Sequence, residues 1–172
     1  KQIFVGNQSS LMLDYQDSNF TGNIFVTDSE ARISYDSLYA LGRSTAGLES
    51  SSDFSELDSI LGTSINEDWA QGTNSPSSTE NFTFFGRSIP NVPVIDSTTG
   101  SEFITGILWD ASDSLDDEFD TTDREDVIFI TKIRLNHTGS YGDYDYELKF
   151  PAPLREYYTG DVQLVNYFYE VR

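Results

Sequence analysis

Residues 126–135, DVIFITKIRL, decide the fold, because their side chains alternate regularly over ten positions. In an extended strand successive side chains point to opposite faces. The segment therefore places Val127, Phe129 and Ile133 on one face. The opposite face is apolar where the segment begins and basic where it ends. This pattern predicts a β-strand.

Strand-like segments lie on both sides of this stretch. Residues 144–150, YDYELKF, follow the glycine-containing break at 136–143, and the two segments together predict a hairpin. A second hairpin is predicted over residues 92–110, VPVIDSTTGSEFITGILWD, in which Gly106 is a candidate β-bulge. Residues 162–171, VQLVNYFYEV, predict a further strand.

The N-terminal half mixes strand and helix signals. Its short strand candidates are residues 1–6, 10–15, 22–28, 31–36 and 81–89. Its short helix candidates are residues 36–42, 53–62 and 66–72. In the second helix candidate, Asp53 and Glu56 match a capping box and Gly62 a C-cap.

Many short strands, frequent turns and few helices are typical of an all-β chain. We predict an antiparallel β-sandwich, immunoglobulin-like or jelly-roll-like, with two or three short helices in its loops. A chain of 172 residues is long enough for one sizeable core, so residues 1–172 are expected to form a single domain.

The composition argues against several classes of partner. The chain carries 29 acidic and 10 basic residues, a formal charge of −19. It has no basic cluster that could displace counterions from nucleic acid or bind an anionic membrane surface. No run of about 18 apolar residues predicts a transmembrane segment. The absence of cysteine excludes thiol catalysis and disulfides.

Reactive groups for an enzyme are scarce. The only histidine, His137, lies in the expected hairpin loop, where a solvated turn residue is the ordinary role. No nucleophile-elbow, phosphate-loop, dinucleotide or zinc-protease motif occurs. Paired carboxylates are abundant, but abundance among 29 acids is no specific signal. We therefore predict that the protein is not an enzyme and uses no organic cofactor.

An acidic loop is the strongest candidate binding site. Residues 109–126, WDASDSLDDEFDTTDRED, contain nine acids. Calcium takes roughly six to eight oxygen ligands in a tolerant geometry, although the EF-hand spacing is absent here. The candidate calcium ligands are Asp110, Asp113, Asp116, Asp117 and Asp120, and Glu118 and Asp123 offer further oxygens. The alternative is a splayed, solvated loop screened by salt, with Asp110 hydrogen-bonded at its start.

Surface modification and sugar binding are further expectations. Four Asn-x-Ser/Thr sequons mark candidate glycosylation sites at Asn7, Asn19, Asn81 and Asn136. The chain begins at Lys1 without an initiator methionine, so we expect a processed N-terminus and an extracellular, cell-surface location. Seven tyrosines fit either a sugar-stacking platform or strands with one half-wet face: Tyr141, Tyr144, Tyr146, Tyr157, Tyr158, Tyr167 and Tyr169.

The first residues form a candidate polymerisation strand. KQIFVGN is apolar and strand-like, with Ile3, Phe4 and Val5 at its centre. Such a segment can pair within its own sheet, or it can add to an exposed sheet edge of a neighbouring copy. In the second case residues 1–13 would be a protruding donor strand, and the contacts would build a head-to-tail homopolymer.

Three segments carry a family resemblance. FITGILWDASDS (103–114), DREDVIFITKIRL (123–135) and GSYGDYDYELKFPAPLREY (139–157) resemble the extracellular β-domains of archaeal pilin-like surface proteins. The resemblance implies a secreted, often glycosylated β-sandwich that assembles or adheres. The long apolar N-terminal helix of pilins is missing, which implies either its removal or assembly by strand donation, as in the archaeal threads.

These observations lead to two functional hypotheses. The first is a structural subunit of an extracellular filament or surface layer, assembled through β-strand addition between copies. The second is a calcium-dependent adhesin or carbohydrate-binding β-sandwich module that uses the acidic loop and exposed tyrosines.

Overall fold

The structure is a computed structural model, and it describes most of the strands and one helix. The described residues are 2–6, 22–27, 33–61, 78–97, 100–120, 122–123, 125–150 and 166–171, of which 2–6, 61 and 166–171 are described by their backbone only. Within them the chain is mostly antiparallel β-structure, with one α-helix, α1 (Asp53–Leu61), and one short 3-10 helix, η2 (Tyr35–Ser37).

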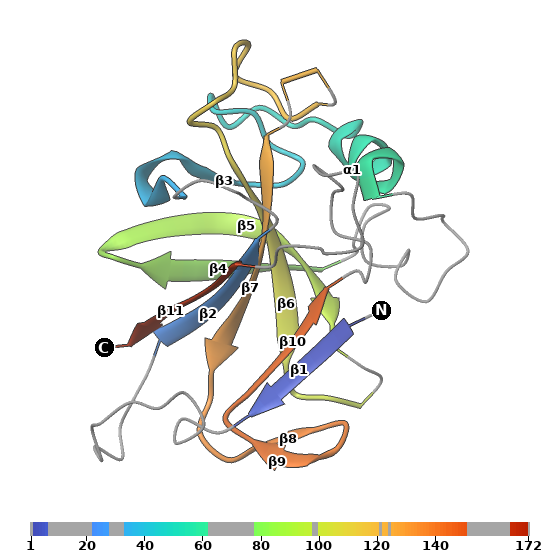
Figure 1. Cartoon of the computed structure of the whole chain (residues 1–172), viewed down its shortest axis with the longest axis vertical. Helices are drawn as coiled ribbons and strands as arrows, with labels where there is room; N and C mark the ends of the chain where they lie inside the picture. The colour runs from blue at the N-terminus through green and yellow to red at the C-terminus, as the bar shows by residue number, and fades with distance from the viewer. Residues whose placement is uncertain are drawn as a thin grey trace.

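The larger layer is a seven-stranded antiparallel sheet (Figure 1). Its strands run in the order β11-β2-β7-β6-β5-β4, and β3 pairs with the end of β6 beyond β5. Their bounds are β2 (Gly22–Thr27), β3 (Leu38–Ala40), β4 (Ser78–Phe84), β5 (Arg87–Asp96), β6 (Ile104–Asp110), β7 (Asp126–Ile133) and β11 (Asn166–Val171).

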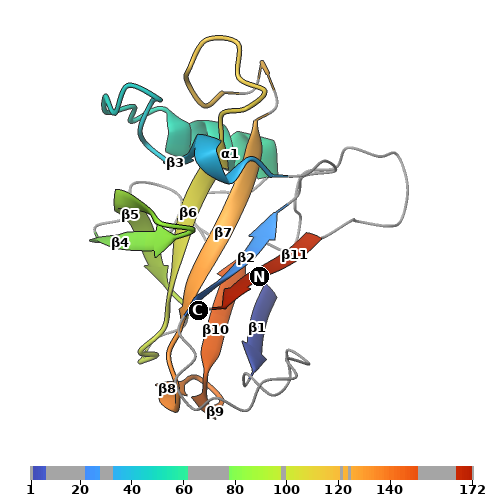
Figure 2. The same cartoon turned by 90° about the vertical axis from the view of Figure 1, so that its left-hand side faces the viewer.

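The smaller layer contains β1 (Gln2–Gly6) and β10 (Tyr146–Phe150), paired antiparallel, with the small hairpin β8 (His137–Gly139) and β9 (Gly142–Tyr144) at one end. Figure 2 shows this layer beside the lower halves of β6 and β7. Aromatic rings join the layers, because the ring centroids of Phe129 and Phe150 lie 6.4 Å apart. The predicted all-β sandwich with few helices is thus confirmed.

Strand β7 is apolar on both faces because it separates two cores. Val127, Phe129 and Ile133 belong to the inter-sheet core, which also contains Tyr146, Leu148 and Phe150 of β10. Ile128 and Ile130 belong to a second core, formed where the β4–β5 hairpin folds over the other face. The predicted alternation of residues 126–135 is confirmed over β7.

The predicted hairpin between β7 and β10 is wrong, because the two strands lie in different sheets. Residues 137–144 form their own small hairpin, and Gly142 at its turn has a φ of +132° that favours glycine. The chain then crosses from one layer to the other, and the Arg134 N–H donates to the Asp145 carbonyl across this crossing at 2.7 Å.

Gly106 lies in regular pairing between Val94 and Ile130, so the predicted bulge at this glycine is wrong. A Cβ at position 106 would lie 2.7 Å from the Phe82 ring and 2.9 Å from Ile130 Cγ2. Glycine is therefore required for close packing. The irregularity in this part of the sheet lies instead in β4, between Glu80 and Phe82.

Residues 81–89, predicted as one strand, contain a tight hairpin turn between β4 and β5. Phe85 has a φ of +46° and Gly86 a φ of +80°. Positive φ at both central residues is the requirement of a type I′ turn, whose twist matches the flanking strands. Because the hydrophobic pattern continues through the turn, the sequence alone did not reveal the turn.

One predicted helix is confirmed and another is wrong. Helix α1 (Asp53–Leu61) matches the candidate at 53–62. Residues 36–42 instead continue from η2 into β3, which pairs with β6 and buries Leu38 and Ala40. The strand candidate at 10–15 and the helix candidate at 66–72 lie outside the described residues, as does Gly62. Within the described residues no helix has the length and apolar character needed to cross a membrane.

Candidate functional site

The acidic loop is folded onto the end of the sandwich rather than splayed. Phe119, in its centre, is 2% exposed and packs edge-on against Trp109, with ring centroids 6.1 Å apart. The indole N–H of Trp109 donates to the Arg43 carbonyl at 3.0 Å, and the Thr45 N–H donates to the Asp117 carbonyl. One aromatic anchor and a neighbouring loop therefore fix the acidic segment.

Asp110 is a structural residue at the end of β6. Its carboxylate accepts the Ser34 N–H at 2.7 Å and the Ser112 N–H at 2.9 Å. The side chain is nearly completely buried. The structure agrees with the interpretation that Asp110 forms hydrogen bonds at the start of the loop.

Other acids of the loop also accept backbone N–H groups. Asp123 accepts from Leu115 at 2.6 Å, and Asp116 accepts from Glu118 at 3.1 Å. Asp120 accepts from the two residues at positions 122 and 123. Such charge-assisted bonds place partial positive charge beside each carboxylate and hold a loop in a single conformation.

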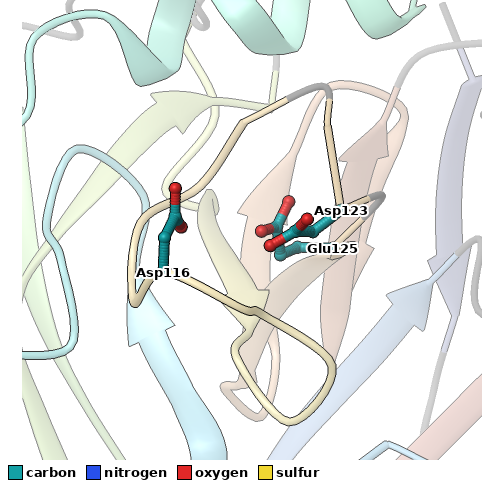
Figure 3. Close-up of side chains that lie close together, drawn as sticks. All are labelled: Asp116, Asp123 and Glu125. Carbon is teal, nitrogen blue, oxygen red and sulfur yellow. The ribbon is translucent and has the colours of Figure 1, made fainter.

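Three acids converge in space: Asp116, Asp123 and Glu125 (Figure 3). One carboxylate oxygen from each lies within 4.8 Å of the others. Of the five predicted calcium ligands only Asp116 belongs to this cluster, and Asp113, Asp117 and Asp120 lie outside it.

Glu125 is the member of the cluster that sequence reasoning missed. It lies just before β7 and is completely buried, and burial raises the pKa of its carboxyl group above the usual range. Its Oε2 accepts the Asp120 N–H at 3.2 Å. In the sequence it is one more acid in an acidic run, so only the tertiary structure distinguishes it.

His137 forms a hydrogen bond with Glu102 at the surface. Its Nδ1 is 2.9 Å from Glu102 Oε2; the His137 side chain is partly exposed and that of Glu102 is exposed. The N–H of Thr138 donates to the same carboxylate, and this bond, followed by the contact with His137, holds the Glu102 pKa below its usual range. The pair ties β8 to the segment before β6.

Two of the predicted glycosylation sites lie in the described residues, and both are exposed. Asn81 is on β4, where its Oδ1 accepts the Asn91 N–H at 3.1 Å. Asn136 is in the turn before β8, with a φ of +55°. Asn7 and Asn19 lie outside the described residues.

The predicted polymerisation strand pairs with β10 of its own chain in this structure. Ile3, Phe4 and Val5 lie opposite Lys149, Leu148 and Glu147, respectively. This is the intramolecular arrangement that the sequence left open beside a protruding donor strand. Among the described strands β1 is the only partner of β10, and we call the edge of β10 that it covers the acceptor edge.

Side chains and one backbone group occupy the opposite edge of β10, which we call the inner edge. The Lys149 N–H donates to Thr105 Oγ1 at 2.9 Å, and Ser97 Oγ donates to the Glu147 carbonyl at 3.2 Å. Further along, the Asp145 carbonyl accepts the Arg134 N–H. Strand β10 is therefore tied to the large sheet without being paired to it.

The comparisons with known proteins found no family model, no curated protein and no solved structure that matches this chain. Its resemblance to pilin-like surface domains therefore stays a prediction, and its function is argued from its own residues.

Proposed function

We propose that the protein is a structural subunit of an extracellular, pilin-like filament or surface layer, in which copies assemble by exchanging β1. One observation supports this most strongly. Among the described strands β1 pairs with β10 alone, at the acceptor edge, and β10 has no other strand partner.

Exchange of β1 between copies would preserve the pairing seen in one chain. The neighbour's β1 would enter the same acceptor edge in the same register, so little free energy separates the two arrangements. Residues 7–21 join β1 to β2. A fully extended stretch of that length would span about 50 Å, which is enough to reach an adjacent domain.

Such contacts give a head-to-tail polymer. The donor is β1 and the acceptor is β10, so each copy offers two different surfaces. Heterologous contacts of this kind form open chains unless a rotation happens to close them into a ring. A copy of the same chain is therefore the proposed partner, and no catalytic step is needed.

The surface chemistry fits an exported protein. The formal charge of −19 keeps copies soluble before assembly, and both described sequon asparagines are exposed and accessible to a glycan. Glycans on asparagine are therefore part of the proposal, together with a cell-surface location.

Cysteine cross-linking tests strand exchange directly, because the native chain contains no cysteine. Ile3 and Lys149 face each other in the register. Because the Lys149 N–H points to the inner edge, this is a non-hydrogen-bonded pair, with a Cα separation of about 4.5 Å that suits a disulfide. We would mix two single variants, Ile3→Cys and Lys149→Cys, under assembly conditions and then oxidise them.

A disulfide between positions 3 and 149 in this mixture can form only between copies. We expect cross-linked dimers with that peptide pair by mass spectrometry, and electron microscopy of the unmodified protein should show filaments or layers. The double variant, Ile3→Cys with Lys149→Cys, is the control that reports pairing within one chain. If it cross-links only internally and the mixture gives no 3–149 pair, strand exchange is wrong.

A second candidate function rests on the Asp116, Asp123 and Glu125 cluster: a cation-dependent adhesin or sugar-binding module that uses calcium. Calorimetry with calcium should give a binding heat that Asp116→Asn and Asp123→Asn abolish. Asp113→Asn is the matched control, because Asp113 lies in the same loop outside the cluster. No heat with the unmodified protein would dismiss this candidate.

A further inference from the structure

Strand β10 has two edges of different character, and this difference has a functional consequence. We propose that β10 is a one-sided strand acceptor. Ser97 and Thr105 hold its inner edge, so it binds one extended segment and recognises that segment through alternate backbone amides. This inference rests on the proposed function, since the segment is β1 of the same or a second copy.

The inner edge is closed by buried side chains. Ser97, Thr105 and Glu147 each have no exposed surface. Thr105 Oγ1 accepts the Lys149 N–H at 2.9 Å, and Ser97 Oγ donates to the Glu147 carbonyl at 3.2 Å. These hydroxyl groups satisfy backbone groups that would otherwise require a neighbouring strand, because a buried N–H or C=O without a partner is costly.

The direction of these bonds determines which residues face β1. In an antiparallel strand the N–H and C=O of one residue point to the same side, and successive residues alternate. Asp145, Glu147 and Lys149 use their backbone groups at the inner edge. Tyr146, Leu148 and Phe150 must therefore present theirs at the acceptor edge.

The register then identifies the amides of β1 that are recognised. Leu148 lies opposite Phe4, whereas Glu147 lies opposite Val5. The Phe4 N–H therefore points toward β10, and the Val5 N–H points away from it. The ligand class is an extended segment at least as long as β1, with an N–H available for pairing at every second residue. A proline is excluded at position 4 and tolerated at position 5.

The test compares proline with alanine in the full chain, which separates loss of an N–H from loss of a side chain. We expect Phe4→Pro to speed the amide hydrogen exchange of Leu148 about tenfold relative to Phe4→Ala, as loss of a typical backbone hydrogen bond would. The Leu148 amide should exchange at rates within about twofold of each other in Val5→Pro and Val5→Ala. An equal or reversed effect at the two positions would overturn the register and hence the proposal.

A pair of variants at the inner edge covers the case in which a proline variant fails to fold. Thr105→Val removes Oγ1 at nearly constant volume, and Thr105→Ser keeps the hydroxyl. The Lys149 amide should exchange about tenfold faster in Thr105→Val and remain near the native rate in Thr105→Ser. Equal rates in the two variants would show that Thr105 does not hold the edge.

The two proposals fail in different ways. If copies cross-link but proline acts alike at positions 4 and 5, strand exchange is supported and one-sided recognition is wrong. If proline acts differently at the two positions but no cross-link forms between copies, the acceptor edge binds β1 only within one chain and the filament proposal is wrong.

Discussion

Asp53 shows how one residue took a role different from the predicted one. It was expected to cap helix α1, but its carboxylate accepts hydrogen bonds from the Gly42 N–H, at 2.9 Å, and from the Ser50 hydroxyl group. These bonds tie the helix to the loop beside the acidic segment. Burial raises the pKa of Asp53 despite these two bonds, and the charge of Glu118 adds to the rise.

The pH dependence of stability should report this buried carboxyl group. A folded-state pKa above the unfolded value of about 3.9 means that the group favours folding below that value and that this contribution is lost as pH rises through the folded pKa. We expect Asp53→Asn to gain stability relative to the native protein as pH rises above about 4. Urea unfolding at several pH values measures this, and parallel profiles would contradict it.

Gly106 gives a second prediction at the residue scale. Gly106→Ala would press a methyl group against the Phe82 ring and Ile130, so we expect a loss of about 1–3 kcal/mol in the free energy of unfolding. Adding Phe82→Leu should recover part of the loss, because it removes the ring that the methyl group meets. A fully additive double-mutant cycle would show that the contact is not the cause.

The acidic loop illustrates the scale of the element. Its nine acids predicted either a cation site or a splayed loop. The structure shows that the loop is not splayed, because its carboxylates bond to its own backbone, and the cation site stays a prediction. Phe119 provides the apolar anchor that such a charged segment needs. A single phenylalanine among acids forms no hydrophobic period, so the sequence analysis did not predict that Phe119 would be buried.

Phe119→Ala should release the loop while leaving the strands in place. The Phe119 ring fills part of the inter-sheet core. Its removal should therefore lower the free energy of unfolding by about 3 kcal/mol. Because Trp109 packs against Phe119, its fluorescence should shift to the red as water reaches the indole. Leu115→Ala, at an exposed position of the same loop, is the matched control and should change neither quantity.

At the scale of the whole molecule the charge of −19 opposes compactness. Salt screens this repulsion over about 10 Å at 0.1 M, so the melting temperature should rise with sodium chloride. A melting temperature that is flat or falls with salt would contradict this. Calcium at matched ionic strength should add a further rise only if the acidic cluster binds it, and Asp116→Asn should remove that part alone.

The sequence by itself determined the layered all-β character of the chain. Alternation of side chains along residues 126–135 is local and follows from strand geometry, so β7 and its two apolar faces were predictable. The same holds for helix α1 and for the strand character of the first residues, because each signal lies within a few neighbouring positions.

Only the tertiary structure decided which strands pair and which acids meet. β7 and β10 are close in sequence, yet they lie in different sheets, because the residues between them fold into their own hairpin. Leu38–Ala40, inside the helix candidate at 36–42, form a strand because β6 offers them an edge. Glu125 differs from Asp116 and Asp123 by being buried, and Ser97 and Thr105 hold the inner edge of β10. Pairing, burial and edge closure depend on contacts between distant residues, which no local pattern encodes.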